Sequence, residues 1–215
     1  NDQLTGITSP REGGVSFFGT TVTTILPTGG GTGGGETVTY SADGSTVTFT
    51  GTSTDTLSGG TASLTNSTNS KTATIAIVEG YGSIGNYAFQ NASSLTEITI
   101  GASVTKIGEY AFYGASNLET VTFEAGSQLK SIGKQAFYNA TSLTEINIPA
   151  SVTSIGIGAF SGATILSNIT FSEGSAITSI GNYAFSGAKG LTSITIPASV
   201  TSIGQHAFQG TTNLT

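Results

Sequence analysis

The chain has 215 residues and a formal net charge of −6, and only 8% of its residues are charged. This length allows one large domain or two small ones, and the six Lys and Arg residues are too scattered to form the basic patch that nucleic acid requires. Cysteine is absent, which excludes disulfides, thiolate catalysis and Cys-ligated metals, and no apolar run approaches the ~18 residues of a membrane-spanning helix.

Residues 1–28 are the first predicted region and contain one apolar segment, Val15 to Leu26. Its apolar residues are Val15, Phe17 and Ile25 on one face of an extended chain, and Phe18, Val22 and Leu26 on the other. This pattern predicts a strand that is buried on both faces. Residues 29–35 are almost all glycine, and their composition predicts a flexible linker.

Residues 36–71 are rich in Thr, Ser and Gly and predict a β-rich cap region. Thr37 to Ser41 and Ser45 to Thr50 alternate apolar and polar side chains on either side of Ala42-Asp43-Gly44, which predicts a β-hairpin. We expect this hairpin to cover the N-terminal end of the region that follows.

Residues 72–215 carry an internal repeat, the hexad Ile-Gly-x-x-Ala-Phe, which occurs six times. Its isoleucines are Ile84, Ile107, Ile132, Ile155, Ile180 and Ile203, at spacings that alternate between 23 and 25 residues. Ordering one such coil costs ~1 to 2 kcal/mol per residue, whereas each of its few apolar side chains contributes only ~1.5 to 3 kcal/mol. The coils must therefore stack on one another, which predicts a solenoid.

A second element, Leu-x-x-Ile-x-Ile or a variant with Val or Phe, lies between successive hexads. Its final apolar residues alternate with polar ones, which predicts a short strand with one buried face. After the strands that end in Phe123 and Phe171, a longer acidic turn supplies the two extra residues of the longer spacing. A weaker form of the pattern at Ile75 and Ile77 predicts that the solenoid begins near Thr72.

Each Ala-Phe pair is followed two residues later by Gly or Asn, and these residues tolerate a left-handed backbone. The six positions are Asn91, Gly114, Asn139, Gly162, Gly187 and Gly210. We therefore predict that each coil contains a short helical turn closed by a left-handed residue.

The segment Leu143 to Phe160 reads Leu-Thr-Glu-Ile-Asn-Ile-Pro-Ala-Ser-Val-Thr-Ser-Ile-Gly-Ile-Gly-Ala-Phe, and it resembles the BspA-like leucine-rich repeats. The resemblance covers about residues 72–215. It implies a mainly β leucine-rich-repeat solenoid on a secreted or surface-anchored protein, in a family linked to adhesion and protein contacts, and it implies no catalytic residues. Family members usually place Cys three residues after the Phe, where this chain has Ala92, Ala115, Ala140, Ala163, Ala188 and Thr211.

Candidate catalytic groups are few, and we predict no catalytic, cofactor-binding or metal-binding residues. His206 is the only histidine, and every Asp is far from it in sequence, so a Ser-His-Asp triad is not expected. Glu97 and Glu145 share one strand column two coils apart, at a separation near ~10 Å by strand spacing. That distance only reaches the edge of the range for inverting glycosidases, so we interpret both as solvated surface carboxylates.

Two columns of side chains bear on glycan binding. One is an outward ladder of small polar residues, Thr99, Thr122, Asn147, Thr170 and Thr195. Such a ladder could bind glycans or order water, but Thr is also a favourable exposed strand residue. A glycan-binding module is also expected to show exposed aromatics in one column, and Tyr113 with Tyr138 begins a column that stops at Ser161.

These observations predict a non-enzymatic extracellular structural or adhesive protein that uses its solenoid for protein–protein contacts. The alternatives that remain open are a monomeric adhesin module that binds glycans or host proteins and, less favoured, a glycoside hydrolase. Its expected partners are surface proteins, glycans or other copies of the chain.

Head-to-tail assembly into a filament is a further prediction. The chain stops at Leu214-Thr215, at the start of a strand that it does not complete, and the N-terminal strand hangs on a linker whose flexible reach is ~14 Å. That strand could add to a neighbouring subunit, or it could fold back onto its own cap. The residues predicted to make the contact are Val15, Phe17, Phe18, Val22, Ile25, Leu26 and Leu214.

Overall fold

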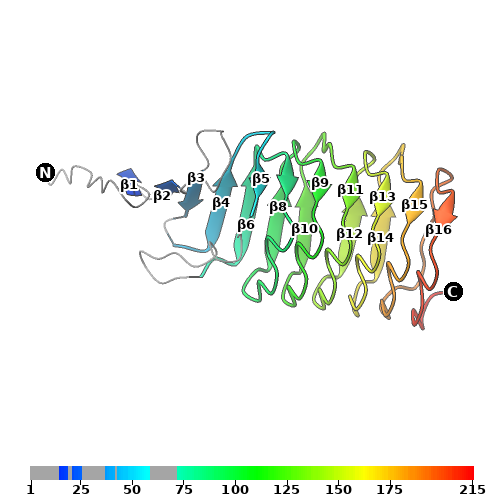
Figure 1. Cartoon of the computed structure of the whole chain (residues 1–215). Coiled ribbons are helices and arrows are strands. Elements are labelled where there is room, and N and C mark those ends of the chain that lie inside the picture. The colour runs from blue at the N-terminus through cyan, green and yellow to red at the C-terminus, as the bar shows by residue number, and fades with distance from the viewer. Residues whose placement is uncertain (1–14, 19–20, 26–36, 42, 59–71) are drawn as a thin grey trace, which may run out of the picture.

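The computed structural model describes residues 15–18, 21–25, 37–41, 43–58 and 72–215, and it arranges them as two rows of strands along one axis (Figure 1). The first row consists of β1 (Val15–Phe18), β2 (Thr21–Ile25), β3 (Thr37–Tyr40), β4 (Thr46–Thr50), β6 (Ile75–Glu79), β8 (Glu97–Ile100), β10 (Thr120–Phe123), β12 (Glu145–Ile148) and β14 (Asn168–Phe171). The second row consists of β5 (Thr56–Leu57), β7 (Ser83–Ile84), β9 (Lys106–Ile107), β11 (Ser131–Ile132), β13 (Ser154–Ile155), β15 (Ser179–Ile180) and β16 (Ser202–Ile203).

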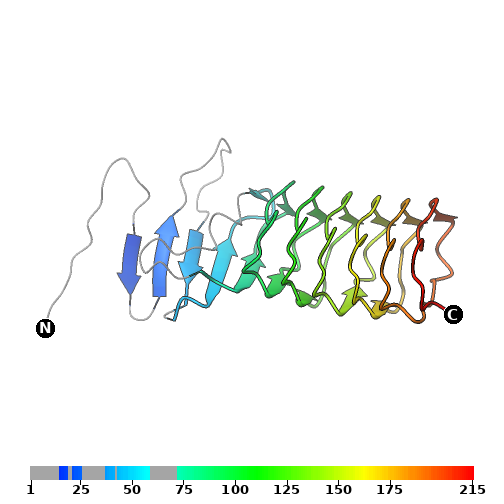
Figure 2. The same cartoon turned by 90° about the horizontal axis from the view of Figure 1, so that it is seen from below.

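Each coil from β4 to β15 contributes one strand to the first row and one two-residue strand to the second, and the last coil contributes only β16. In the second row, strands of neighbouring coils pair in parallel and in register, so that Ile132 lies between Ile107 and Ile155. That row is continuous from β5 to β16. Seen from below, the coils follow one another as a regular series between β4 and β16 (Figure 2). The predicted mainly β solenoid is confirmed.

A column of phenylalanine rings runs through the centre of the coils. The ring of Phe137 stacks on Phe112 and Phe160, with centroids 4.9 and 5.2 Å away, and all three side chains are fully buried. The same contact repeats along Phe89, Phe112, Phe137, Phe160, Phe185 and Phe208. The Leu and Ile of the strands and the Ala of each hexad fill the space around this column. The interior is therefore one continuous core in which each coil covers its neighbours.

The segment around each Ala-Phe pair is a run of turns, and no helix occurs in the described residues, so the predicted short helical turn is wrong. The reason lies in the backbone hydrogen bonds. The N–H groups of Tyr87, Phe89 and Asn91 donate to carbonyls of the next coil, while those of Ala88 and Gln90 donate three residues back. Alternation between the two directions prevents the uninterrupted local bonding of a helix. The predicted left-handed closing residues are confirmed, with φ between 55° and 77° at all six positions.

The N-terminal strands extend the first row beyond the repeats. β3 and β4 form the predicted hairpin, and Asp43 Oδ1 stabilises its turn by accepting hydrogen bonds from Ser41 Oγ (2.6 Å) and the Ser45 N–H (3.0 Å). β4 pairs in parallel with β6, and β5 pairs in parallel with β7. Parallel stacking thus already includes the coil that precedes Thr72.

The segment Val15 to Leu26 was expected to form a single strand, and this prediction is wrong. It contains two antiparallel strands, β1 and β2, in which Phe18 pairs with Thr21. β2 continues the sheet by pairing with β3. The sequence carries a hairpin signal at this place, because Gly19 stands between two runs that alternate apolar and polar residues. Leu26 and the predicted linker, residues 29–35, lie outside the described residues.

Candidate interaction surfaces

The first row of strands is interrupted wherever the repeat spacing is 25 residues. β8 pairs with β10, and β12 pairs with β14, but β10 and β12 belong to different sheets. Residues 193–196, which follow β14 by one coil, form no strand. The strand face of the described solenoid therefore consists of a continuous sheet that ends at β10 and of the pair β12–β14, with an opening after each.

Proline explains where the openings lie. One residue after each strand, the N–H of Gly101, Glu124 or Ser172 donates to the preceding coil, with N···O distances of 2.8 to 3.0 Å. Pro149 and Pro197 occupy the same position in the other two coils, and proline has no N–H to donate. Each opening thus begins at a missing ladder hydrogen bond, and the long turn of the preceding coil leaves room for it.

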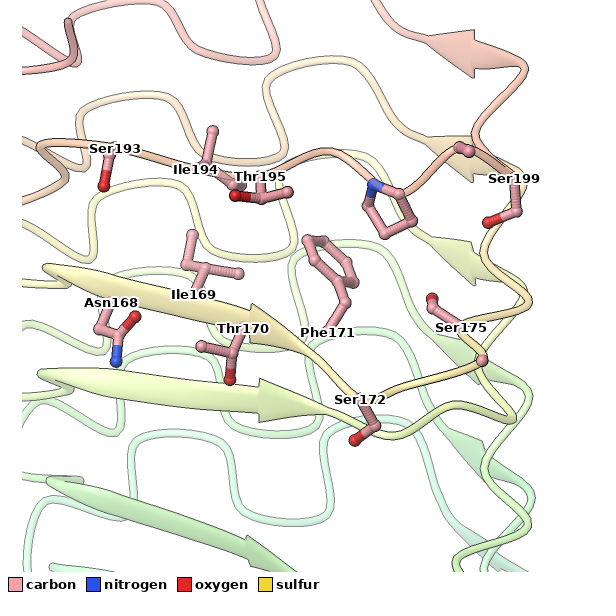
Figure 3. A pocket seen from close by; sticks show the side chains of 13 residues that line it. Asn168, Ile169, Thr170, Phe171, Ser172, Ser175, Ser193, Ile194, Thr195 and Ser199 are labelled. Atoms are coloured by element: carbon pink, nitrogen blue, oxygen red, sulfur yellow. The ribbon is translucent and has the colours of Figure 1, made fainter.

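Two strand grooves occupy these openings. The first groove lies between β10 and β12 as two adjoining hollows of about 340 and 430 Å³ that share Phe123 and Asn147. The second groove, about 550 Å³, lies between β14 and residues 193–199. Figure 3 shows Phe171 projecting into the second groove, with Ile169 and Ile194 beside it and hydroxyl side chains around the rim. The two grooves repeat the same surface two coils apart.

The phenylalanine that lines each groove differs from its equivalents elsewhere. Ile100 and Ile148 hold the corresponding positions in two of the other coils and are fully buried, whereas Phe123 and Phe171 are only partly buried. The grooves also differ in charge, because Glu119, Glu124 and Glu145 line the first and no charged residue lines the second. The first groove thus offers an aromatic ring next to carboxylates.

The hydroxyl groups of the second groove are not all paired. Ser151 Oγ, near the first groove, lies 2.8 Å from the carbonyl oxygens of both Ser127 and Leu129 in the preceding coil. Its equivalent, Ser199 Oγ, is buried at the second groove without a hydrogen-bond partner among the described residues. The second groove therefore differs from the first in the hydrogen bonding of this buried hydroxyl.

A different surface lies on the edge formed by the Ala-Phe turns. The residue two before each Phe also has a left-handed backbone, although most of these residues are not Gly or Asn. They are Tyr87, Tyr110, Gln135, Gly158, Tyr183 and His206, with φ between 50° and 61°. This second left-handed column was missed, because its residue types give no sign of the conformation. Because all six coils share this conformation, the geometry of the repeat fixes it, and the five residues that have a Cβ adopt it at some cost in backbone strain.

Four tyrosines on this edge form a contiguous patch, here called the tyrosine patch, consisting of Tyr87, Tyr110, Tyr113 and Tyr138. The rings of Tyr87 and Tyr110 are parallel within 3° with centroids 5.0 Å apart, and those of Tyr113 and Tyr138 are parallel within 7° at 4.9 Å. Tyr110 and Tyr113 connect the two pairs at 5.8 Å. Two rings that lay edge to edge in one plane would clash at this centroid distance. The paired rings therefore lie face to face, and their edges and hydroxyl groups point outward.

Charged side chains flank the tyrosine patch. Lys134 Nζ lies 5.5 Å from the centroid of the Tyr110 ring, within the range of a cation–π contact. A hydrogen bond with Tyr110, and then the charge of that group, raises the pKa of Lys134, so this exposed lysine stays protonated at neutral pH. Glu109 precedes Tyr110 and is exposed. The patch therefore combines aromatic edges with one positive and one negative group.

The catalytic candidates do not come together. His206 is exposed and stacks on Tyr183, with ring centroids 5.0 Å apart. Glu97 and Glu145 are exposed on β8 and β12, and the intervening strand β10 places Thr120 beside Glu97. In the part of the chain that the structure describes, no group of three or more His, Cys, Asp or Glu could hold a metal ion. That part also contains no helix long and apolar enough to cross a membrane.

The predicted polar ladder borders the strand grooves. Thr170 Oγ1 donates to Asn147 Oδ1 at 3.0 Å, and Asn147 also contacts Ser172 Oγ at 3.2 Å, so neighbouring rungs are hydrogen bonded. Thr122 and Asn147 line the first groove, while Thr170 and Thr195 line the second. The ladder and the grooves are thus one strand face.

The residues predicted for assembly fall at both ends of the described chain. Val15, Phe17 and Phe18 lie in β1, and Val22 and Ile25 lie in β2. Leu214 is partly buried and packs against the core of the last coil. β1 is the outermost strand of its sheet among the described residues. The two ends are not in contact in the single chain, and assembly stays a prediction.

The repeat and its coil geometry match a known family. The model for the BspA type leucine-rich repeat region matches residues 82–215 with six copies. The chain belongs to this family. BspA-type repeats account for more than half of its length, and the predicted family is confirmed. No curated protein matches the sequence.

Several solved structures of leucine-rich-repeat proteins are similar to this chain. The pneumococcal vaccine antigen PcpA is 25% identical with a TM-score of 0.53, over 93% of this chain and 48% of that one. A leucine-rich cell surface protein from Faecalibacterium prausnitzii A2-165 is 27% identical with a TM-score of 0.51, over 86% and 53%. A leucine-rich-repeat protein from Eubacterium ventriosum ATCC 27560, 22% identical with a TM-score of 0.54 over 89% and 64%, shares the fold. The present chain spans about half the length of the first two.

Proposed function

We propose that this BspA-type protein is a non-enzymatic adhesive protein of the cell surface or the extracellular space, and that it holds a protein partner on its strand face. The names of two similar structures, a vaccine antigen and a cell surface protein, support the location. The observation that carries the proposal is the pair of strand grooves at Pro149 and Pro197. Each combines a partly buried phenylalanine with hydrogen-bonding side chains, which is the composition of a pocket for a partner's side chain.

The first groove suits a Lys or Arg side chain of that partner. The aliphatic stem of such a side chain would pack on Phe123 while its cation approaches Glu119, Glu124 or Glu145, which line the same opening. A net charge of −6 attracts basic surfaces in general. The second groove has no charged lining and suits an uncharged side chain that can pack on Phe171.

Binding of purified extracellular proteins to the immobilised chain tests this function. We expect at least one protein to bind, Phe123→Ser and Glu145→Gln each to weaken that binding about 3-fold or more, and Thr99→Ser to leave it unchanged. Binding that is insensitive to both groove variants would place the partner elsewhere. A glycosidase activity that Glu145→Gln abolishes would contradict the non-enzymatic part of the proposal.

Glycan binding is the second candidate function, and the polar ladder favours it. Thr99, Thr122, Asn147, Thr170 and Thr195 form a regular row of hydrogen-bonding groups beside the grooves. The tyrosine patch offers sugars less than single rings would, because they pack against ring faces and one face of each ring is covered by its stacking partner. Binding of wild type and of Asn147→Ala to a glycan array separates the two candidate functions. A glycan that binds on this ladder should bind wild type and not Asn147→Ala, whereas a protein that binds only other proteins should bind no glycan on the array.

Strand donation between subunits is the finer form of the assembly proposal. It is supported by the position of β1 at the outer edge of its sheet among the described residues, where unpaired backbone groups can accept another strand. The pairing of β2 with β3 shows that the same segment can also extend its own sheet. Electron microscopy of the full chain and of a variant lacking residues 1–28 tests it. Filaments that survive the deletion would refute donation, and so would an intact chain that stays monomeric at high concentration.

A further inference from the structure

We propose that the edge carrying the tyrosine patch is the interface of an antiparallel, two-fold symmetric dimer of this chain. This contact is separate from the strand face and from the N-terminal strands, and so it does not depend on the adhesive function or on strand donation. Three properties of this edge indicate that a second copy of the chain binds there: the distance between its coils, the charged residues beside the patch and the sizes of its side chains.

The repeat distance of the patch matches that of another solenoid. Its stacked rings follow one another at 4.9 to 5.0 Å, because each comes from the next coil. An extended peptide laid along the edge would present side chains on one face every ~6.6 to 6.8 Å and would lose register within a few residues. A second solenoid has the same coil spacing and stays in register over the whole patch.

The charges select the antiparallel orientation. Glu109 and Lys134 occupy the same column in adjacent coils, and both are exposed. In a parallel two-fold pair each residue would face its own copy, which sets Glu109 against Glu109 and Lys134 against Lys134. In an antiparallel pair whose two-fold axis passes between these coils, each Glu109 faces the Lys134 of the other copy. The second arrangement converts two repulsive contacts into two attractive ones.

The sizes of the remaining side chains fit the same axis. Tyr113 and Tyr138 lie on adjacent coils, so each faces the other residue's ring in the second copy. Tyr87 is 52% exposed and lies one coil further out, opposite Gly158, the only residue of the left-handed column without a side chain. Ile157, 49% exposed, flanks that gap and gives the entering Tyr87 ring an apolar contact. The gap at Gly158 thus receives Tyr87 on both sides of the axis.

The proposed interface, from the coil of Tyr87 to the coil of Gly158, covers only four coils, or ~14 Å along the solenoid at ~4.7 to 4.9 Å per coil. A contact of this length is too short to bury the ~800 Å² per partner of a standard interface. We therefore expect a weak dimer that forms reversibly as the protein concentration rises. Because its central contacts are between charges, the dimer should also weaken as the salt concentration rises.

Sedimentation equilibrium of the full chain, from the low micromolar to the millimolar range, tests the dimer. We expect a monomer–dimer equilibrium whose dissociation constant rises at least about 10-fold in Glu109→Lys and in Lys134→Glu, since like charges then meet at the axis. The double variant Glu109→Lys/Lys134→Glu should return to within about 3-fold of wild type, because the opposite charges face each other again. Gly158→Tyr, which fills the gap opposite Tyr87, should weaken the dimer at least about 10-fold.

Circular dichroism of each variant checks that the solenoid remains folded. A chain that stays monomeric at every concentration would overturn the proposal. So would association that neither Glu109→Lys nor Gly158→Tyr affects, or a folded double variant that fails to recover the dimer. Assemblies that grow beyond the dimer and ignore these substitutions would also overturn it, since a two-fold interface closes on itself.

Discussion

Two columns of this solenoid adopt the same left-handed backbone, and only one of them restricts its residue types. The inner column contains only Gly and Asn, whereas the outer column, four residues earlier in each coil, contains three tyrosines, a histidine, a glutamine and a single glycine. The φ values of the two columns overlap, at 55° to 77° and 50° to 61°. Backbone conformation alone therefore does not explain the difference.

The space between coils explains part of the difference. A Cβ added to Gly114 or Gly162 would collide with the side chain of Asn91 or Asn139 in the preceding coil. A Cβ added to Gly158 would meet only the flexible side chain of Gln135, at 3.2 Å, and Ser161 at 3.8 Å. The inner column is thus limited by packing where the preceding coil carries Asn, whereas a Cβ at Gly187 or Gly210 would come no closer than 3.7 Å to the preceding coil.

The largest loss of stability should come from the core that both columns enclose. Phe137→Ala removes a fully buried ring stacked on two others and should cost ~3 to 5 kcal/mol of unfolding free energy. The matched variant Phe123→Ala removes a partly buried ring at the first groove and should cost clearly less. Urea denaturation of both variants measures the difference, and equal losses would show that the groove is as much a part of the core as the column.

Backbone contact between coils should give the next largest effect. A Cβ on Gly156 would lie 2.6 Å from the carbonyl carbon of Gly133 and 2.7 Å from the nitrogen of Lys134, neither of which can rotate away. We expect Gly156→Ala to cost ~1 to 3 kcal/mol, by overpacking two coils. Thr99→Ser on the strand face is the control, with an expected change within about 0.5 kcal/mol. Thermal melting that does not separate these two variants would contradict the close approach.

Removal of a tyrosine from the outer column should hardly change stability. Tyr110→Gly loses two ring contacts but relieves a left-handed backbone that is unfavourable for a residue with a Cβ, so the two changes oppose each other. We expect a net change within about 1 kcal/mol in thermal unfolding. A loss as large as that of Phe137→Ala would mean that the tyrosine patch is structural.

The smallest effect should appear only at high pH, at the N-terminal end. Burial raises the pKa of Tyr40 above its usual value of 10.0. The folded state therefore favours the neutral phenol, and this stabilisation is complete below the unfolded pKa and is lost as the pH rises through the folded value. We expect Tyr40→Phe to lose less stability than wild type as the pH rises from neutral to above about 10. Parallel alkaline curves for the two proteins would contradict this.

Much of the fold could be predicted from the sequence, because the same pattern of buried and exposed residues occurs six times. The hexad predicts that Phe and Ala are buried. The Gly and Asn of the inner column predict a left-handed backbone, because these residue types tolerate it best. The openings could not be predicted in the same way, because Pro149 and Pro197 act through a hydrogen bond missing between coils. The outer column was also hidden, since Tyr87 and His206 resemble ordinary surface residues until their φ values of 60° and 58° are known.

The most direct test of this account places the same residue in both columns of one turn. Gly158 and Gly162 have φ of 61° and 77°, so tyrosine at either position carries a similar backbone cost. We expect Gly162→Tyr to lower the unfolding free energy by at least ~1 kcal/mol more than Gly158→Tyr, because only Gly162 lies against the Asn139 side chain. Denaturant unfolding at a concentration too low for association measures both. Equal destabilisation would show that the two columns do not differ in available space, and would contradict the account.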